Sequence, residues 1–237
     1  MKMKKVQNLA ASLCDAEVKL SPVGAFRLVE DMVTELMGNM KIDGVTCMRE
    51  YGAMWVFVRN KIEFRQSLFW MEEYIAESYI SSFSNVKLFI DTVLKKQDGS
   101  IALASRLELC AVDLETGKIR KSATVGLGEN TQPEEPEIDI AFTREKFQPT
   151  EEVEKVISRS SDIDYCHHTN NISYICYLIN QYSVTELAEH PLQAIEVQYV
   201  NQTHEGDELS IWRCTGKDIF TIQFDGKPAV NCIITRE

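Results

Sequence analysis

Residues 161–179 read Ser161-Asp-Ile-Asp-Tyr-Cys-His-His-Thr-Asn-Asn-Ile-Ser-Tyr-Ile-Cys-Tyr-Leu-Ile179, and the interpretation of the chain starts from this stretch. Its first half crowds two aspartates, a cysteine, two histidines and two asparagines into ten residues. Its second half places apolar side chains at a helical period, namely Ile172, Ile175, Cys176, Leu178 and Ile179. Titratable groups therefore gather at the start of a predicted helix, where they serve chemistry, metal binding or helix capping.

A helix followed by long antiparallel strands is predicted twice along the chain. The first helix begins at Ser21, an N-cap with Pro22 at the first helical position, and is predicted to end at Gly38. The elements predicted around the two helices are a weak strand and loop over 4–19, strands at 53–65, 71–82, 86–96, 101–113 and 153–158, a short helix from Ser183, and strands at 194–202, 208–214, 219–224 and 229–234. This repeat favours an α+β protein with two similar halves.

The halves are separated by a segment without an apolar period. Residues 129–150 are acidic and rich in proline, which is typical of a linker on the surface. We therefore predict an N-terminal domain over 1–128, a linker over 129–150 and a C-terminal domain over 151–237.

Composition narrows the classes of function. The formal net charge of −11 argues against nucleic acid or an anionic membrane as the main partner, because both attract a basic face. No signal peptide or membrane span is recognised near the N-terminus. The seven cysteines are scattered without a C-x-x-C pair, which indicates reduced thiols and a cytoplasmic location.

Three stretches resemble motifs of the acyl-acyl carrier protein (acyl-ACP) thioesterases of plants and bacteria. Residues 162–171 are similar to the family's D-x-D-x-N-x-H-V-N-N, residues 52–63 to its G-x-x-W-V-x-x-R-x-x-I-x, and residues 199–207 to its Y-x-x-E-x-x-x-G-D. Residues 106–117 also fit the strand that leads to the family's D-x-x-T-G/R. The matches occur in order along nearly the whole chain.

The resemblance implies two tandem hot-dog domains, each a long antiparallel sheet wrapped around a central helix. It also implies a cytoplasmic hydrolase that releases a free fatty acid from ACP without a cofactor or metal. In the family the N-terminal half mainly forms the acyl-chain pocket, and the C-terminal half carries catalysis. Asp164 and His168 fall on the family's catalytic Asp and His, and Trp55 and Arg59 fall on its W-V-x-x-R segment, where we expect substrate binding.

Thioester hydrolysis requires a base for water, a stabiliser for the oxyanion and a proton for the leaving thiol. His168 directly precedes the predicted helix, whose N-terminus favours a neutral imidazole and could bind an oxyanion. Asp164 can orient that imidazole, as the acid does in hydrolytic triads. We therefore predict that Asp164 and His168 activate the water.

Two positions depart from the family pattern. Cys166 replaces its Asn, and Gln202 replaces its acidic residue; both are candidate catalytic residues here. Glutamine can position water but cannot accept its proton. The cysteine could be a nucleophile if His168 lowered its pKa. These departures leave open an acyl-CoA thioesterase, another hot-dog enzyme, or an acyl-binding homologue with impaired catalysis.

Other interpretations of the polar residues compete with catalysis. Asn170 and Asn171 are candidate substrate-binding residues, although Asn is also a preferred helix N-cap. Cys166 and the two histidines, with Asp164, could hold a metal, but ligands so close in sequence need an outside partner to complete a tetrahedron. His204 and Glu205 fall in a predicted solvated turn, where either could replace the missing acid.

The remaining expectations concern tryptophans and partners. Trp55 and Trp70 either line an acyl tunnel or belong to the core. An acidic enzyme needs a local basic patch to bind the acidic ACP, and the candidate patches are Arg59, Lys61 and Arg65, and Lys118, Arg120 and Lys121. We expect neither a nucleic-acid nor a membrane partner, and a homodimer is left open.

Overall fold

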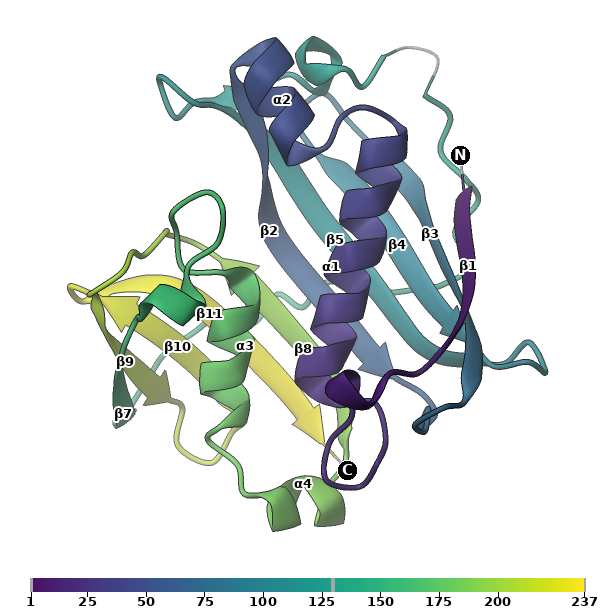
Figure 1. The fold of residues 1–237 in the computed structure, drawn as a ribbon. Coiled ribbons are helices and arrows are strands. Elements are labelled where there is room, and N and C mark those ends of the chain that lie inside the picture. Colours follow the sequence, from purple (N-terminus) through teal and green to yellow (C-terminus); the bar gives the residue numbers. More distant parts are fainter. Residues whose placement is uncertain (1, 129–130, 237) are drawn as a thin grey trace. The chain divides into compact units, whose positions relative to one another are not determined.

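The computed structural model describes residues 2–128 and 131–236. The chain divides into two compact units, Met1–Ala141 and Phe142–Glu237. Each unit combines an antiparallel sheet with a helix that lies on the sheet, so the predicted α+β class is confirmed (Figure 1). None of the helices in the described part of the chain has the length and apolar character needed to cross a membrane.

The first unit is built on the strand order β1-β3-β4-β5-β2, with β6 paired to β5. All of the neighbouring strands run antiparallel. The elements are β1 (Lys2–Asn8), η1 (Ala11–Leu13), α1 (Pro22–Asn39), α2 (Gly44–Tyr51), β2 (Ala53–Phe64), β3 (Glu73–Phe83), β4 (Leu88–Lys95), β5 (Ile101–Asp113), β6 (Ile119–Arg120) and η2 (Ser122–Val125). The strands predicted at 53–65, 71–82, 86–96 and 101–113 correspond to β2–β5 with small shifts at their ends.

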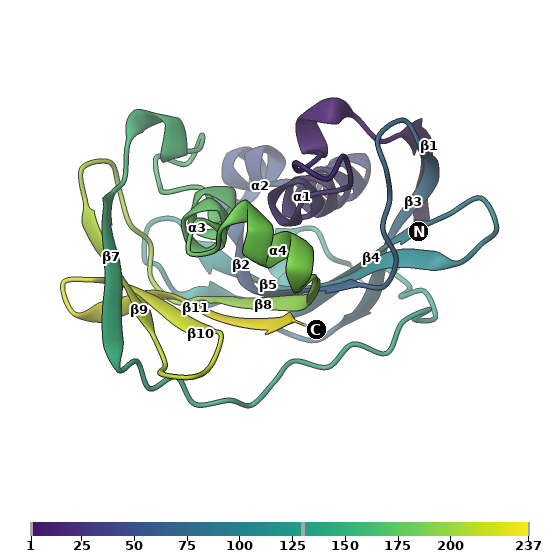
Figure 2. The same ribbon diagram turned by 90° about the horizontal axis from the view of Figure 1, so that it is seen from below.

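Helix α1 lies across this sheet and contacts β1, β3 and β4 (Figure 2). Its N-terminus is fixed as predicted, because the Ser21 side chain accepts a hydrogen bond from the Gly24 N–H at 2.9 Å. Its predicted apolar face is buried at Phe26, Val29, Met32, Val33, Leu36 and Met37. The helix extends one residue past the predicted end at Gly38, which is an ordinary helical residue here.

Helix α2 was not predicted from the sequence. It is only eight residues long and carries one fully buried side chain, Cys47, so it has no apolar stripe to detect. Its N-cap is nevertheless clear, because Asp43 Oδ1 accepts the Thr46 N–H at 3.0 Å. A local capping signal was therefore present in the sequence.

The close approach of α1 to the preceding loop depends on Gly24. A Cβ at this position would lie 2.3 Å from the Leu13 carbonyl oxygen, whereas Gly38, in the same helix, has open space around it. We expect Gly24→Ala to lower the free energy of unfolding by about 1–3 kcal/mol through this clash. Gly38→Ala should raise it by roughly 0.5–1 kcal/mol, since alanine favours helix. Urea unfolding of both variants tests the pair, and equal effects would contradict the role of the close approach.

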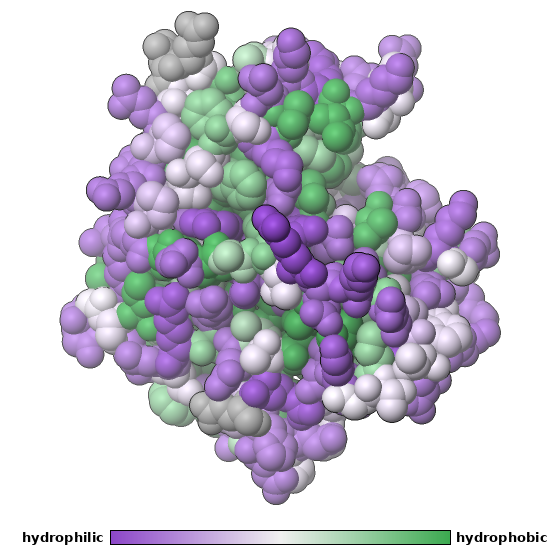
Figure 3. All heavy atoms as spheres, turned by 180° about the vertical axis from the view of Figure 1, so that it is seen from behind, coloured by the Kyte–Doolittle hydropathy of each residue, from purple (hydrophilic) through white to green (hydrophobic). Residues whose placement is uncertain are grey.

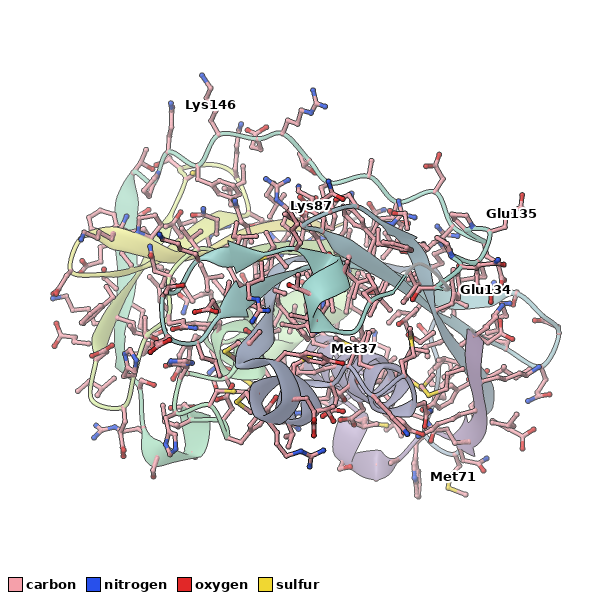
Figure 4. All side chains as sticks on the ribbon, turned by 90° about the horizontal axis from the view of Figure 1, so that it is seen from above. Met37, Met71, Lys87, Glu134, Glu135 and Lys146 are labelled. Carbon is pink, nitrogen blue, oxygen red and sulfur yellow. The ribbon has the colours of Figure 1, made fainter. Side chains whose placement is uncertain are left out.

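The segment predicted as a surface linker is anchored to the first unit. Ile138 and Ile140 are buried, with 6% and 1% exposure, and pack against Val93 and Ala104 of the first unit. The segment is also held by its backbone, because the Glu134 N–H donates to the Ile80 carbonyl at 2.8 Å. Polar side chains of the same segment, such as Glu135, point away from the ribbon (Figure 4). Residues 134–140 therefore cross the surface without helix or strand but are anchored to the first unit by two isoleucines, which was not predicted; the bounds of the linker stay a prediction, and its residues 129–130 lie outside the described residues.

The second unit has the strand order β8-β11-β10-β9-β7 and is also antiparallel. Its elements are β7 (Glu151–Ile157), η3 (Ser160–Asp162), α3 (Asn171–Ile179), α4 (Val184–Glu189), β8 (Leu192–Tyr199), β9 (Glu208–Arg213), β10 (Ile219–Phe224) and β11 (Lys227–Arg236). Helix α3 buries Tyr174, Ile175 and Leu178, and the predicted capping box at Ser183 and Glu186 is present at the start of α4.

The surface agrees with the acidic, polar composition. Hydrophilic side chains cover most of the face shown in Figure 3, with smaller apolar groups between them. An unexpected group of exposed apolar side chains lies between β2 and β3, where Phe69, Trp70 and Met71 are 50%, 53% and 61% exposed. Trp70 therefore lies in an exposed turn and belongs neither to the core nor to a strand.

Candidate active site

The polar cluster before α3 forms a closed turn. Ile163 and Thr169 form an antiparallel bridge, and within it the Asp164 N–H donates to the His168 carbonyl at 3.0 Å. His167 adopts φ 62°, a left-handed conformation that costs a non-glycine residue about 1 kcal/mol. The turn therefore needs local interactions to hold it.

The Asp164 carboxylate supplies those interactions. Its Oδ1 accepts the backbone N–H of Cys166 at 2.8 Å and that of His168 at 3.4 Å. This is an Asx-type turn, in which the side chain replaces a backbone acceptor. Asp164 thus shapes the loop that carries His168, and its negative charge also favours the protonated form of the His168 ring. Direct orientation of the imidazole by Asp164 stays a prediction.

His168 is half-buried at the end of this turn. Burial lowers its pKa below the ordinary value of 6.5, and the neighbouring His204 and His167 lower it further, while Asp164 opposes the shift. The imidazole is therefore neutral at pH 7 and able to accept a proton. This is the protonation state that a general base for water requires.

Cys166 is half-buried in the same turn. Burial raises the pKa of its thiol, and the nearby charge of Asp164 raises it as well. The thiol is therefore protonated at neutral pH, and the thiolate is the form that attacks carbonyl groups. This environment disfavours the nucleophile interpretation of Cys166.

The two asparagines have different positions at the start of α3. Asn170 is the N-cap, and its Oδ1 accepts the Ile172 N–H at 2.7 Å, as the capping interpretation predicts. Asn171 is the first residue of the helix and is half-buried. The capping interpretation is therefore confirmed for Asn170 and wrong for Asn171, and substrate binding by either residue stays a prediction.

Gln202 lies after β8, in a segment without helix or strand, and is exposed. The next residue, Thr203, is fully buried. His204, which follows Thr203, is exposed like Gln202. At the position where the family pattern has an acidic residue, this chain therefore has an amide, two residues before a histidine.

His204 lies in the exposed turn that the sequence predicts, which the Asp207 N–H closes by donating to the His204 carbonyl at 3.2 Å. Its contact with a second histidine was not predicted: the His204 ring packs edge-on against His168, with ring centroids 5.1 Å apart and an interplanar angle of 71°. Its side chain is still 58% exposed, and its Nδ1 lies 3.9 Å from Asp207 Oδ2. The two imidazoles come from segments far apart in sequence, so residue spacing carried no signal of this contact.

Buried hydroxyls connect the two segments that carry the histidines. Thr203 Oγ1 donates to Thr169 Oγ1 at 2.7 Å, Tyr174 Oη lies 2.7 Å from Thr203 Oγ1, and Ser158 Oγ lies 2.9 Å from Thr169 Oγ1. The Thr169 N–H also donates to the Thr203 carbonyl at 2.8 Å. These bonds fix residues 168 and 204 side by side.

The predicted substrate-binding residues of the first unit lie on β2. Trp55 is buried, with 7% exposure, beside the Cys47 thiol, and Arg59 is half-buried. Both belong to the unit Met1–Ala141, whereas the histidine turn belongs to Phe142–Glu237. In the described part of the chain, no three side chains of His, Cys, Asp or Glu are grouped as metal ligands, so the metal alternative gains no support.

Comparison with known proteins agrees with the two-unit hot-dog architecture. Residues 145–226 match the family model described as the acyl-ACP thioesterase C-terminal domain. The fold is similar to that of an acyl-ACP thioesterase from Bacteroides thetaiotaomicron, with a TM-score of 0.90 and 16% identity over 100% of this chain and 98% of that one. It is also similar to the 12:0-ACP thioesterase from Umbellularia californica, with a TM-score of 0.81 and 12% identity over 100% and 98%. No curated protein sequence matches the chain.

These matches confirm two predictions. The tandem hot-dog fold is shared along the whole chain with solved structures. The resemblance to the acyl-ACP thioesterase family is confirmed by the family model, which covers the turn with Asp164 and His168 as well as the segment with Gln202 and His204.

Proposed function

We propose that this protein is a thioesterase that hydrolyses fatty acyl-ACP to a free fatty acid and ACP. The observation that carries the proposal is a neutral, half-buried imidazole, His168, in a turn shaped by a carboxylate at the start of α3. The turn occurs within the residues that match the acyl-ACP thioesterase model. A neutral imidazole at a helix N-terminus is suited to activating water against an acyl group.

In the proposed reaction His168 removes a proton from water as the oxygen attacks the thioester carbonyl. The charge of Asp164 stabilises the imidazolium that forms. The N-terminal end of α3 stabilises the negative charge on the carbonyl oxygen through its partial positive charge. Because the side chain of Asn170 already caps the helix, we assign the contact with substrate to Asn171.

We assign the acyl chain to the first unit, as the predicted division of labour between the domains implies. Trp55 is an apolar, buried side chain on β2, and Arg59 lies four residues further along the same strand. Turnover measured across acyl chain lengths would establish which acyl chain the protein prefers.

The proposal is tested by measuring thioester hydrolysis with matched acyl-ACP and acyl-CoA substrates. We expect faster turnover, as kcat/KM, with acyl-ACP. Clear preference for CoA would indicate an acyl-CoA thioesterase and overturn the carrier assignment. Hydrolysis of neither substrate would overturn the enzymatic assignment.

A second candidate is an acyl-binding homologue with impaired catalysis. Two features favour it: burial raises the pKa of the Cys166 thiol, and the exposed Gln202 amide cannot accept a proton from water. In that case the protein would bind an acyl chain without turnover, and hydrolysis would appear on Gln202→Glu. The same substrate panel therefore separates the two candidates.

The proposed carrier is acidic, so the enzyme must offer cations to it. In the patch at 118–121, Lys118 and Lys121 are exposed, whereas Arg120 donates to the Tyr51 carbonyl at 2.6 Å. In the other patch, Lys61 donates to the Ala141 carbonyl and Arg65 to Glu63, at 2.9 and 3.0 Å. We therefore favour Lys118 and Lys121 as the contacts with ACP.

Reversing both of these charges should weaken carrier binding. We expect Lys118→Glu with Lys121→Glu to raise KM for acyl-ACP by about 10-fold at low salt, since charge pairs at an interface steer association. The effect should shrink as salt increases. Hydrolysis of a short thioester without a carrier protein is the control and should not change. An unchanged KM for acyl-ACP would place the docking surface elsewhere.

We also propose a reducing, cytoplasmic location. All seven cysteines are free thiols, and several of them are half-buried rather than fully buried. Free thiols are typical of proteins that work in a reducing compartment. A homodimer is left to measurement of the mass in solution.

A further inference from the structure

The contact between His204 and His168 gives the site a second imidazole beside the proposed base. The rings meet edge to face at 5.1 Å, and His168 is half-buried while the His204 side chain is 58% exposed. Hydrolysis of a thioester needs two proton transfers, one from the attacking water and one to the leaving sulfur. One half-buried and one exposed imidazole can divide these two transfers.

We propose that His204 donates the proton that the leaving thiol requires, in the hydrolysis that His168 begins. The inference rests on the proposed thioesterase function and adds a catalytic residue to it. Its geometry comes from the ring contact and from Asp207, whose carboxylate lies 3.9 Å from Nδ1 of His204. A carboxylate beside the ring can stabilise the positive charge that an imidazolium carries before it donates its proton.

Asp207 also fixes the position of His204. Its Oδ2 accepts a hydrogen bond from the His204 backbone N–H at 2.8 Å. The Asp207 backbone N–H in turn donates to the His204 carbonyl at 3.2 Å. The fully buried Thr203 bonds to Thr169 on the other side of His204. His204 is thus an exposed side chain on a fixed backbone, which is what a donor to a bound substrate requires.

The reaction returns both histidines to their starting states if the two rings together carry one extra proton, on His204, at the start. In the first step His168 takes a proton from water, the water oxygen bonds to the carbonyl carbon, and a tetrahedral oxyanion forms. In the second step that oxyanion collapses, the carbon–sulfur bond breaks, and His204 gives its proton to the departing sulfur. The carboxylic acid that results ionises, and His168 then passes its proton back to His204 directly or through water. The pair ends as it began.

Repulsion between the rings couples these steps. A positive charge on His204 disfavours a proton on His168, as do burial and His167, whereas Asp164 favours it. Once His204 has given its proton to sulfur, that repulsion is removed and His168 can hold its proton more easily. The charged and titratable groups that bear on the pair are Asp164 and His167, which act on His168, and Asp207, which lies 3.9 Å from Nδ1 of His204.

Leaving groups of different basicity test the role of His204. A thioester of an alkyl thiol needs a proton at sulfur, whereas a thioester of an acidic aryl thiol leaves without one. We expect His204→Ala to lower kcat about 10²-fold with the alkyl thioester and less than threefold with the aryl thioester of the same acid. His168→Ala should lower both. His190→Ala, a change at an exposed histidine at the end of α4, is the matched control and should lower neither.

Asp207→Asn provides a second variant, since an amide oxygen can still accept the His204 N–H. We expect this variant to stay folded and to lose more activity with the alkyl thioester than with the aryl thioester, because it removes the negative charge 3.9 Å from Nδ1 of His204. Equal losses for the two thioesters in His204→Ala, or no loss, would overturn the proposal while leaving thioesterase activity in the wild type. Absence of hydrolysis of either ester by the wild type would instead overturn the proposed function.

Discussion

His168→Ala should lower kcat/KM for acyl-ACP by about 10³-fold or more while the protein stays folded. The expected loss is large because the imidazole is the proposed base for water, and removing such a group takes away most of the catalysis. The fold should survive because the turn is held by the backbone of residue 168, whose carbonyl accepts the Asp164 N–H at 3.0 Å. The ring itself is only half-buried.

The measurement combines steady-state hydrolysis with thermal unfolding. His190→Ala is the control for loss of a histidine elsewhere in the same unit, and it should leave kcat/KM unchanged. A folded His168→Ala protein with the wild-type rate would refute the role of His168. A variant that does not fold would be replaced by His168→Gln, which keeps a polar side chain of similar size.

The same residue sets the expected pH dependence. Burial lowers the His168 pKa below 6.5, so the ring stays neutral to a lower pH than a free histidine does. Activity should therefore be lost only as the pH falls through this lowered value, where the base becomes protonated. In the same range the folded state loses stability, because the unfolded chain binds the proton more readily than the folded one.

The second large effect is expected at Asp164. Two substitutions there separate the hydrogen bonds that hold the turn from the negative charge that acts on His168. Asp164→Ala removes the acceptor for the Cys166 and His168 N–H groups, so we expect stability to fall by about 1–2 kcal/mol and kcat/KM by about 10²-fold. Asp164→Asn keeps an oxygen that can accept both bonds but removes the negative charge. We expect it to keep the stability and to lower kcat/KM by only about 10-fold.

The charge also moves the pH profile in a direction that can be checked. Asp164 favours the protonated His168, so its neutralisation should lower the His168 pKa further. The acidic limb of the kcat/KM profile should then shift to lower pH in Asp164→Asn. A shift of the acidic limb to higher pH, or equal stability losses in Asp164→Ala and Asp164→Asn, would contradict these separate roles of the Asp164 hydrogen bonds and charge.

Local signals in the sequence predicted most of the fold. Ser21 and Pro22, followed by an apolar helical period, predicted the start and the buried face of α1, and the strands predicted at 86–96 and 101–113 correspond to β4 and β5. Helix α2 was missed because it has a cap but no apolar stripe. The anchors Ile138 and Ile140 were missed because isolated apolar residues in an acidic, proline-rich segment carry no period.

The part of the site formed by residues close together in the sequence was predictable. Asp164, Cys166 and His168 lie within one turn, so their proximity follows from sequence, and the cap at Asn170 follows from residue type. The use of the Asp164 carboxylate on the backbone was not predicted, because the choice between backbone and ring depends on atomic geometry. The place of His204 depends on the pairing of two distant segments, which only the folded chain determines.

The buried hydroxyl chain has a consequence for the dynamics of the site. Thr203 donates to Thr169, so Tyr174 donates to Thr203, and Thr169 shares a further hydrogen bond with Ser158 in which either hydroxyl is the donor. Opening the segment would break this chain together with the Thr169 amide bond. The Thr169 amide proton should therefore exchange with solvent as slowly as those of the central strands. The segment with Thr169 has an irregular backbone and lies next to the proposed catalytic base. It would nevertheless open only when the core unfolds, and not as a separate mobile lid.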